Sequence, residues 1–238
     1  MAPSSRSVQL FRRDLEELAA RLGLRRELEP IVDKLVDMYA KGLVKINHSA
    51  LELVVAGYLV KRGYENVDVE HTVPDGMVCD VYAEKAWSSL VVEVETGFTP
   101  PSNALDPVDY LRARIVAKVA RYGRYASKMA LAIPPYYAAP IPSPLLKPPR
   151  ARRKEDIAAL KELVDRYYTS PPIPVDSLWS ARLHTIVIVD VDRGTAYETD
   201  PEAYYESLGS IVRAYANMNK NFIPGSYNRK AFIRPRTK

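Results

Sequence analysis

Two short segments rich in Val and Tyr, which carry three acids between them, constrain this chain more than any other feature. Residues 77–83 read MVCDVYA and residues 90–96 read LVVEVET. Both are predicted strands, because β-branched and aromatic residues favour extended structure and a polar turn separates the segments. Side chains alternate along a strand, so Glu93 and Glu95 share one face, about 6 to 7 Å apart. A hairpin would place Asp80 beside them.

Three carboxylates at such spacing repel one another unless a positive group joins them. Carboxylate oxygens are the ligands that Mg²⁺ and Mn²⁺ prefer in proteins. We therefore predict a divalent cation, Mg²⁺ or Mn²⁺, bound by Asp80, Glu93 and Glu95.

The elements around these acids follow from hydrophobic periodicity and from turn residues. The order between residues 47 and 133 is helix, three strands, helix and strand, an αβββαβ unit. The expected fold class is α/β, with a mixed sheet flanked by helices. Further helices are predicted at 5–22, 29–40, 154–168 and 201–217, and further strands at 184–191 and 195–198.

The predicted organisation is one domain with appendages. Residues 134–149 hold seven prolines, which predicts an extended, polyproline-like connector rather than a packed element. The segments are the N-terminal helices (1–46), the αβββαβ core (47–133), a proline-rich basic connector (134–153), a C-terminal α/β extension of the same domain (154–219) and a basic tail (220–238).

Composition argues against several classes of protein. The single cysteine, Cys79, rules out an intrachain disulfide framework and a multi-cysteine zinc site. No apolar run is long enough to span a bilayer, and the first residues do not resemble a signal peptide. A soluble, cytoplasmic protein is expected. The abundance of proline, 19 residues, and the single glutamine, Gln9, fit a thermophilic source.

The net charge of +5 is unevenly distributed. Residues 1–219 carry 28 basic and 29 acidic residues, whereas residues 220–238 carry six basic residues and no acid. Cations interleaved with aromatic residues suit contacts with phosphates and bases, although such a tail can also pack on the body or around a dimer partner. Nucleic-acid contacts are predicted at Arg121, Tyr122, Tyr125, Arg150, Arg152, Arg153, Arg229, Lys230, Arg234 and Arg236.

The element order, with Asp80 on the second strand and Glu93 on the third, resembles the core of the PD-(D/E)xK nuclease superfamily, which has the restriction-endonuclease-like fold. The helix that ends in YLVKRGY, residues 58–64, is similar to the opening of archaeal Holliday-junction resolvases. The resemblance implies that Asp80 and Glu93 bind metal and that Glu52 of the first core helix helps to hold the metal or its water. By analogy, it also implies a homodimer.

The third-strand motif of that family ends in a lysine that positions the nucleophilic water and stabilises the transition state, and this position is Glu95 here. Either the lysine function has moved, or Glu95 is a further metal ligand, or the site is inactive. The predicted relocated lysine is Lys118, four residues before Tyr122 on one face of the following helix, and this pair resembles the Q-x-x-x-Y motif of RecB-like nucleases, with Lys in place of Gln. Arg121 and Tyr125 repeat this spacing on the same predicted helix. The alternative is a solvated basic face beside core tyrosines.

Two residues near the start of the first core helix have alternative interpretations. Ser49 and Glu52 have the S-x-x-E spacing of a capping box, so Glu52 is expected either to bond the backbone there or to join the acids. His48, one turn earlier, is expected to belong to the helix start rather than to the site.

The leading hypothesis is an archaeal-type, Mg²⁺-dependent deoxyribonuclease, an endonuclease that cuts branched or single-stranded DNA. Asp80, Glu93 and Glu95 are its predicted ligands, with Glu52 as accessory acid and Lys118 as the cationic group. The residues do not distinguish DNA from RNA. One rival is an inactive nucleic-acid-binding protein on the same fold, and another is an assembly or regulatory protein whose added helices form an interface.

Overall fold

The computed structural model of the 238-residue chain describes residues 3–218. The chain divides after Tyr204 into two units. The first unit contains all of the strands of the described chain and seven of its α-helices. The helices are α1 Ser5–Arg21, α2 Glu29–Ala40, α3 Ile46–Lys61, α4 Pro107–Tyr122, α5 Ser143–Leu146, α6 Lys154–Asp165, α7 Val175–Ser180 and α8 Pro201–Met218, and the strands are β1 Glu65–Thr72, β2 Val78–Lys85, β3 Ser88–Val94, β4 Lys128–Ile133, β5 Thr185–Asp190 and β6 Thr195–Thr199.

The strands form a single mixed sheet, in the order β1-β2-β3-β4-β5-β6. The pairs β1–β2, β2–β3 and β5–β6 are antiparallel, and β3, β4 and β5 run parallel in the centre. A parallel pair needs a long crossover, and α4 supplies it between β3 and β4. The predicted α/β class, with a mixed sheet flanked by helices, is confirmed.

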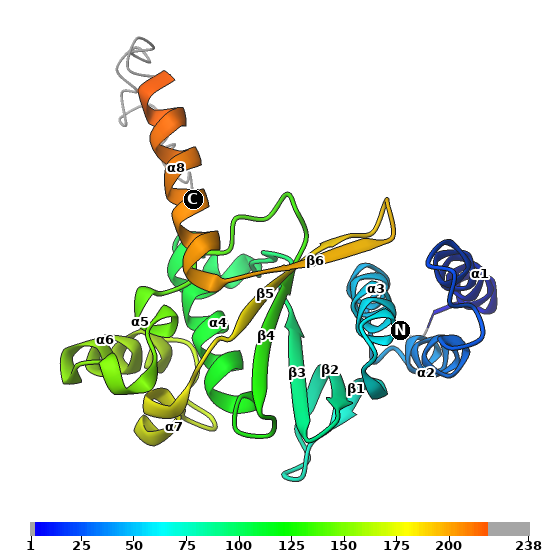
Figure 1. Cartoon of the computed structure of the whole chain (residues 1–238), viewed down its shortest axis with the longest axis horizontal. Coiled ribbons are helices and arrows are strands. Elements are labelled where there is room, and N and C mark those ends of the chain that lie inside the picture. Colours follow the sequence, from blue (N-terminus) through cyan, green and yellow to red (C-terminus); the bar gives the residue numbers. More distant parts are fainter. Residues whose placement is uncertain (1–2, 219–238) are drawn as a thin grey trace, which may run out of the picture. The chain divides into compact units, whose positions relative to one another are not determined.

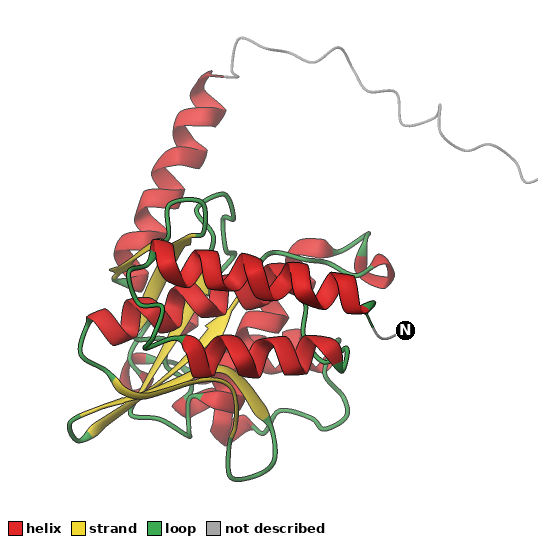
Figure 2. Cartoon of the chain, turned by 90° about the vertical axis from the view of Figure 1, so that its right-hand side faces the viewer, coloured by secondary structure: helices red, strands yellow, loops and turns green. Residues whose placement is uncertain are grey.

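Helices cover both faces of this sheet. Figure 1 shows α1, α2 and α3 on one side and α4, α5, α6 and α7 on the other, and each side has its own buried apolar cluster. Figure 2 shows helices lying across the sheet. The sequence LELVVAGYLV of α3 is apolar on nearly every side, as expected of a helix that is buried between other layers. The central strands β4 and β5 are near-continuous apolar runs for the same reason.

Three expectations about local structure are wrong. Residues 134–153 are packed rather than an extended connector: Ala139, Ile141 and Leu145 are buried in the cluster on the α4 side. Helix α3 begins at Ile46 with Lys45 at its N-cap, so Ser49 and Glu52 lie inside the helix and form no capping box. Helix α4 ends at Tyr122, so the following tyrosine, Tyr125, is not on its face. Among the described helices, none is long and apolar enough to cross a membrane.

Candidate metal and carboxylate site

The acids meet where β2 and β3 separate. The last pair of their ladder at this end is Val81 with Val92. Beyond it, two side chains replace the backbone bonds: the Asp80 amide donates to Glu93 Oε1 at 3.2 Å, and the Val94 amide donates to Asp80 Oδ2 at 2.6 Å. Buried amides need acceptors, and here the carboxylates supply them. These two hydrogen bonds also hold the carboxylates of Asp80 and Glu93 in place where the strands separate.

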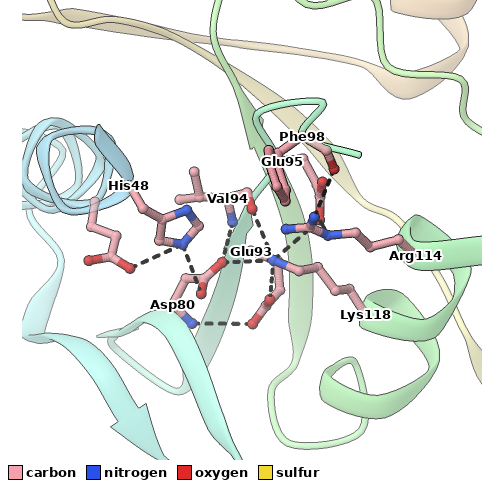
Figure 3. A network of polar contacts seen from close by, with 9 residues as sticks. His48, Asp80, Glu93, Val94, Glu95, Phe98, Arg114 and Lys118 are labelled. Carbon is pink, nitrogen blue, oxygen red and sulfur yellow. Dashed lines mark hydrogen bonds and ion pairs between the residues drawn. The ribbon is translucent and has the colours of Figure 1, made fainter. Parts of the chain in front are cut away.

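Lys118 lies among the three acids that the sequence predicted. Its Nζ is 3.0 Å from Asp80 Oδ2, 2.9 Å from Glu93 Oε2 and 3.3 Å from Glu95 Oε1, and it also donates to the Val94 carbonyl at 2.9 Å. Figure 3 shows the lysine reaching from α4 into this group of acids. Its predicted place beside the acids is confirmed.

Glu95 has a second cation, which the sequence reasoning did not identify. Arg114 of α4 places Nε 2.9 Å from Glu95 Oε1 and donates through a terminal nitrogen to the Phe98 carbonyl at 3.3 Å. Glu95 is completely buried, and its oxygens accept no hydrogen bond of normal geometry, so both contacts are ion pairs by distance. Arg114 stands four residues before Lys118, and that helical spacing is a signal that could have found it.

A different set of residues has the spacing of a metal site. Within the described residues, His48, Glu52 and Asp80 each offer one ligand atom, and these atoms lie within 4.8 Å of one another. His48 Nε2 is 3.3 Å from Glu52 Oε1 and 3.2 Å from Asp80 Oδ1. Neither oxygen of the fully buried Glu52 accepts a hydrogen bond. A buried carboxyl group without a donor needs a proton or a cation.

Solvent reaches this cluster through three side chains. The exposed fractions are 23% for His48, 15% for Asp80 and 16% for Lys118, whereas Glu52 and Glu95 have none and Glu93 has 2%. His48, Asp80 and Lys118 are therefore the partly exposed members of the cluster, and the remaining acids are buried.

Burial and mutual repulsion shift the pKa values of these acids. Burial, with the charge of Asp80, raises the pKa of Glu93 to about 8 even though Lys118 acts in the other direction. Burial, Asp80 and Glu70 raise the pKa of Glu52 well above its usual range. For Asp80, burial opposes ionisation, but Lys118 and His48 outweigh it, so its pKa lies below the usual range. Burial would lower the pKa of Lys118, and the surrounding acids raise it instead. The cluster thus holds more carboxyl groups than cations. Glu52 and Glu93 are the two acids of the cluster whose pKa rises as a result.

Comparison with protein-family models, with curated proteins and with solved structures found no match to this chain. The chemistry of the site must therefore be inferred from its own residues.

The group with metal-site spacing differs from the predicted ligand set. It contains Asp80 together with His48 and Glu52, whereas Glu93 and Glu95 face protein cations. The expectation that His48 belongs only to the helix start is wrong, because its ring contacts both carboxylates.

The residues predicted to contact nucleic acid differ in their exposure and in their partners. Arg150 and Arg153 are exposed, as such contacts require. Arg152 is buried, and its guanidinium donates to backbone carbonyls of residues 144, 147, 178 and 179, so it holds the fold together and is closed to a ligand. Arg121 stacks over Tyr168, Tyr122 packs on the α4-side core, and Tyr125 bonds Asp75. The predicted contacts of Arg229, Lys230, Arg234 and Arg236 lie outside the described residues.

Proposed function

We propose that this chain is a metal-dependent nuclease that hydrolyses phosphodiester bonds of DNA, with a divalent cation held by His48, Glu52 and Asp80. The observation that carries the proposal is Glu52: a fully buried carboxyl group, without a protein donor, that faces an imidazole and a second carboxylate at ligand spacing. The element order from α3 to β4 supports it, since this is the order of the restriction-endonuclease-like core that the sequence resembles.

The donor set fits a divalent cation. Two carboxylates suit Mg²⁺ and Mn²⁺, and an imidazole nitrogen favours Mn²⁺ of the two. Three protein ligands leave positions for water and for a phosphate oxygen. When bound, such an ion lowers the pKa of a water ligand and neutralises charge on the phosphate.

The chain's own residues supply the remaining functions. The Lys118 side chain is 16% exposed beside Asp80, and in the proposed enzyme its ammonium group would donate to a phosphate oxygen or to the attacking water. Glu93 and Asp80 fix the position of that ammonium group, since their oxygens lie 2.9 Å and 3.0 Å from Nζ. Lys118 would thus perform the role that the resemblance assigns to the motif lysine, from α4 rather than from β3.

Glu95 and Arg114 support the loop that leaves β3. Arg114 links Glu95 to the Phe98 carbonyl, and the Phe98 side chain next to it is exposed. An exposed aromatic ring beside the acids suits stacking on a base, which supports a nucleic acid as the substrate over a small phosphate ester. A homodimer is also proposed, by analogy with structure-specific nucleases.

The test is cleavage of branched, flapped and single-stranded DNA by the full chain with Mg²⁺ or Mn²⁺. Asp80→Asn is expected to lower the rate at least about 100-fold, because it removes a metal ligand and the partner of Lys118. Glu84→Gln is the matched control, a half-buried acid near the other end of the same strand, and should leave the rate unchanged. Absence of cleavage with both metals, together with DNA binding that survives Asp80→Asn, would contradict the proposal.

DNA binding without cleavage would favour an inactive nucleic-acid-binding protein built on the same fold. The observation that supports this alternative is the ion pairing of Lys118, which already neutralises part of the acidic charge without a metal. Binding that is indifferent to salt between about 50 and 200 mM, where phosphate contacts weaken sharply, would instead favour an assembly protein.

A further inference from the structure

Glu70 of β1 is a further acid beside this site, and no pattern in the sequence predicted it as a site residue. The ladder pairs on either side of it are Val69 with Val81 and His71 with Cys79. Glu70 therefore stands opposite Asp80 on the neighbouring strand, where directly opposed residues have Cβ atoms about 4.5 to 5.5 Å apart. Its half-buried carboxyl group also lies within hydrogen-bonding reach of Glu52.

The backbone at Glu70 is unusual. Its φ is 46°, in the left-handed region, which a residue with a long side chain seldom adopts. Val69 packs in the core on the α3 side, so regular alternation would turn Glu70 to the other face. Glu70 nevertheless interacts with Glu52 of α3, and its positive φ departs from the regular strand backbone at this point.

A second positive φ on the same strand serves as a comparison. Asn66 has φ 48°, but asparagine tolerates this region, and its side chain donates to Glu84 Oε2 at 2.7 Å. Glutamate does not tolerate this region as asparagine does, so the backbone conformation of Glu70 lowers the stability of the fold, and the surrounding structure must offset that cost. Backbone strain of this kind is found mainly at functional sites.

An independent observation concerns the residue that Glu70 contacts. Glu52, its neighbour, is fully buried, and neither of its oxygens has a protein donor, although it belongs to the group with metal-site spacing. Glu70 is not a member of that group, but it interacts with Glu52 and stands across from Asp80. A carboxyl group in this position suits the outer partner of a metal ligand, and such partners orient the ligands they contact.

We infer that Glu70 is the third acid of the cation site: it orients the Glu52 carboxylate toward the ion and accepts hydrogen bonds from waters that the ion retains. Mg²⁺ and Mn²⁺ bound by few protein ligands keep several waters, which need acceptors beyond the first ring of ligands. The inference rests on the cation site of the proposed function, but it does not require that DNA be cleaved. Glu70 is thus a positioning residue.

Titration calorimetry of the metal-free full chain with Mn²⁺ tests the inference. Glu70→Gln keeps the side-chain shape and removes the charge, and it is expected to weaken Mn²⁺ binding about 10- to 100-fold. Glu65→Gln, an exposed acid on the same strand, is the matched control and should bind as the wild type does. Equal Mn²⁺ affinity for the wild type and Glu70→Gln would overturn the inference.

A thermal melt of the metal-free protein separates this role from a structural one. Glu70→Gly relieves the strained φ, so it should melt above the wild type while binding Mn²⁺ more weakly. Asn66→Gly, the control for the same φ, should change neither quantity appreciably. A Glu70→Gly variant that melts lower and binds Mn²⁺ as the wild type does would show that Glu70 is structural, against the inference.

Failure of this inference differs from failure of the proposed function. If the wild type binds Mn²⁺, cuts no DNA and loses affinity through Glu70→Gln, the inference stands and the nuclease proposal falls. If the wild type cuts DNA and Glu70→Gln leaves Mn²⁺ affinity unchanged, the inference falls and the nuclease stands. A wild type that binds no Mn²⁺ contradicts both.

Discussion

Two neighbouring groups of buried acids in this protein differ in the partners that the rest of the chain provides. On the α4 side, Glu93 and Glu95 are buried beside Lys118 and Arg114. On the α3 side, Glu52 is equally buried, but its contacts are the imidazole of His48 and other acids. Asp80 lies between the groups and contacts both Lys118 and His48. Figure 3 shows Asp80 in this shared position.

This difference in partners means that carboxylates brought close together by the fold are not equivalent as metal ligands. A buried acid that already faces an ammonium or guanidinium group gains little from a metal, because the protein cation would have to move away. A buried acid without a donor gains the most. The cation is therefore expected on the α3 side, and three changes test this contrast.

The largest effect is expected from Lys118→Met. The change leaves Asp80, Glu93 and Glu95 without their shared cation, and removal of one partner from a buried ion pair costs about 3 to 5 kcal/mol. Denaturant unfolding of the metal-free protein at neutral pH measures the loss. Lys128→Met, at an exposed lysine of β4, is the control and should cost no more than about 0.5 kcal/mol. Equal losses for the two variants would mean that the α4-side acids do not depend on Lys118.

Glu52→Gln is expected to act in the opposite direction. The raised pKa of Glu52 means that its favourable contribution is present below the ordinary value of 4.5 and is lost as pH rises through its folded value. The amide avoids that loss, so the metal-free variant should be more stable than the wild type near pH 8.5, by about 1 to 3 kcal/mol, the general cost of an unsatisfied buried polar group. Near pH 4 the two should be alike.

Unfolding curves in a chelator at the two pH values check this sign. Glu84→Gln is the control, because the Glu84 carboxylate accepts hydrogen bonds from Asn66 and Tyr82, and its loss should bring no gain at high pH. A Glu52→Gln variant that is less stable than the wild type near pH 8.5 would reveal a protein donor for Glu52 and would remove the contrast between the two sides.

The smallest effect is expected at Asp68, an acid of β1 that contacts Lys34 at 2.8 Å and His71 at 2.9 Å. Burial would raise its pKa, but these two partners outweigh burial and lower it below 3.8. Its contribution is therefore present above that value and is lost as pH falls through the folded pKa. Because the side chain is 37% exposed, solvent screens the pair, and Asp68→Asn should cost less than about 1 kcal/mol at neutral pH.

Unfolding at pH 7 and near pH 2.5 measures this contribution, and the difference in unfolding free energy between variant and wild type should be smaller at the lower pH. A cost as large as that of Lys118→Met would show that exposed and buried acids contribute alike, against the account given for the cluster.

Much of the fold was predictable because local pattern and tertiary structure agree. The helix Glu29–Ala40 and the strand Lys128–Ile133 are found as expected, since one has helical periodicity and the other is an apolar run bounded by polar residues. The segment 134–153 was not predictable from its prolines. Proline restricts the backbone, but it does not prevent the side chains between prolines, such as Ile141 and Leu145, from packing into a core.

The site was predictable in part. Strand alternation and a hairpin were enough to bring Asp80 and Glu93 together, and helical spacing was enough to place Lys118 beside them. Which acids receive protein cations depends on how α3 and α4 pack on the two faces of the sheet, and the pattern of one strand carries no such information. Glu70 was missed for a related reason, because its position depends on strand register and on a positive φ.

The most direct test of the central claim is the position of Mn²⁺ in crystals of the full chain, located by its anomalous scattering. The account predicts a peak within coordination distance of His48, Glu52 and Asp80, with Lys118 still paired to Glu93. A peak between Asp80, Glu93 and Glu95, with Lys118 displaced, would contradict it.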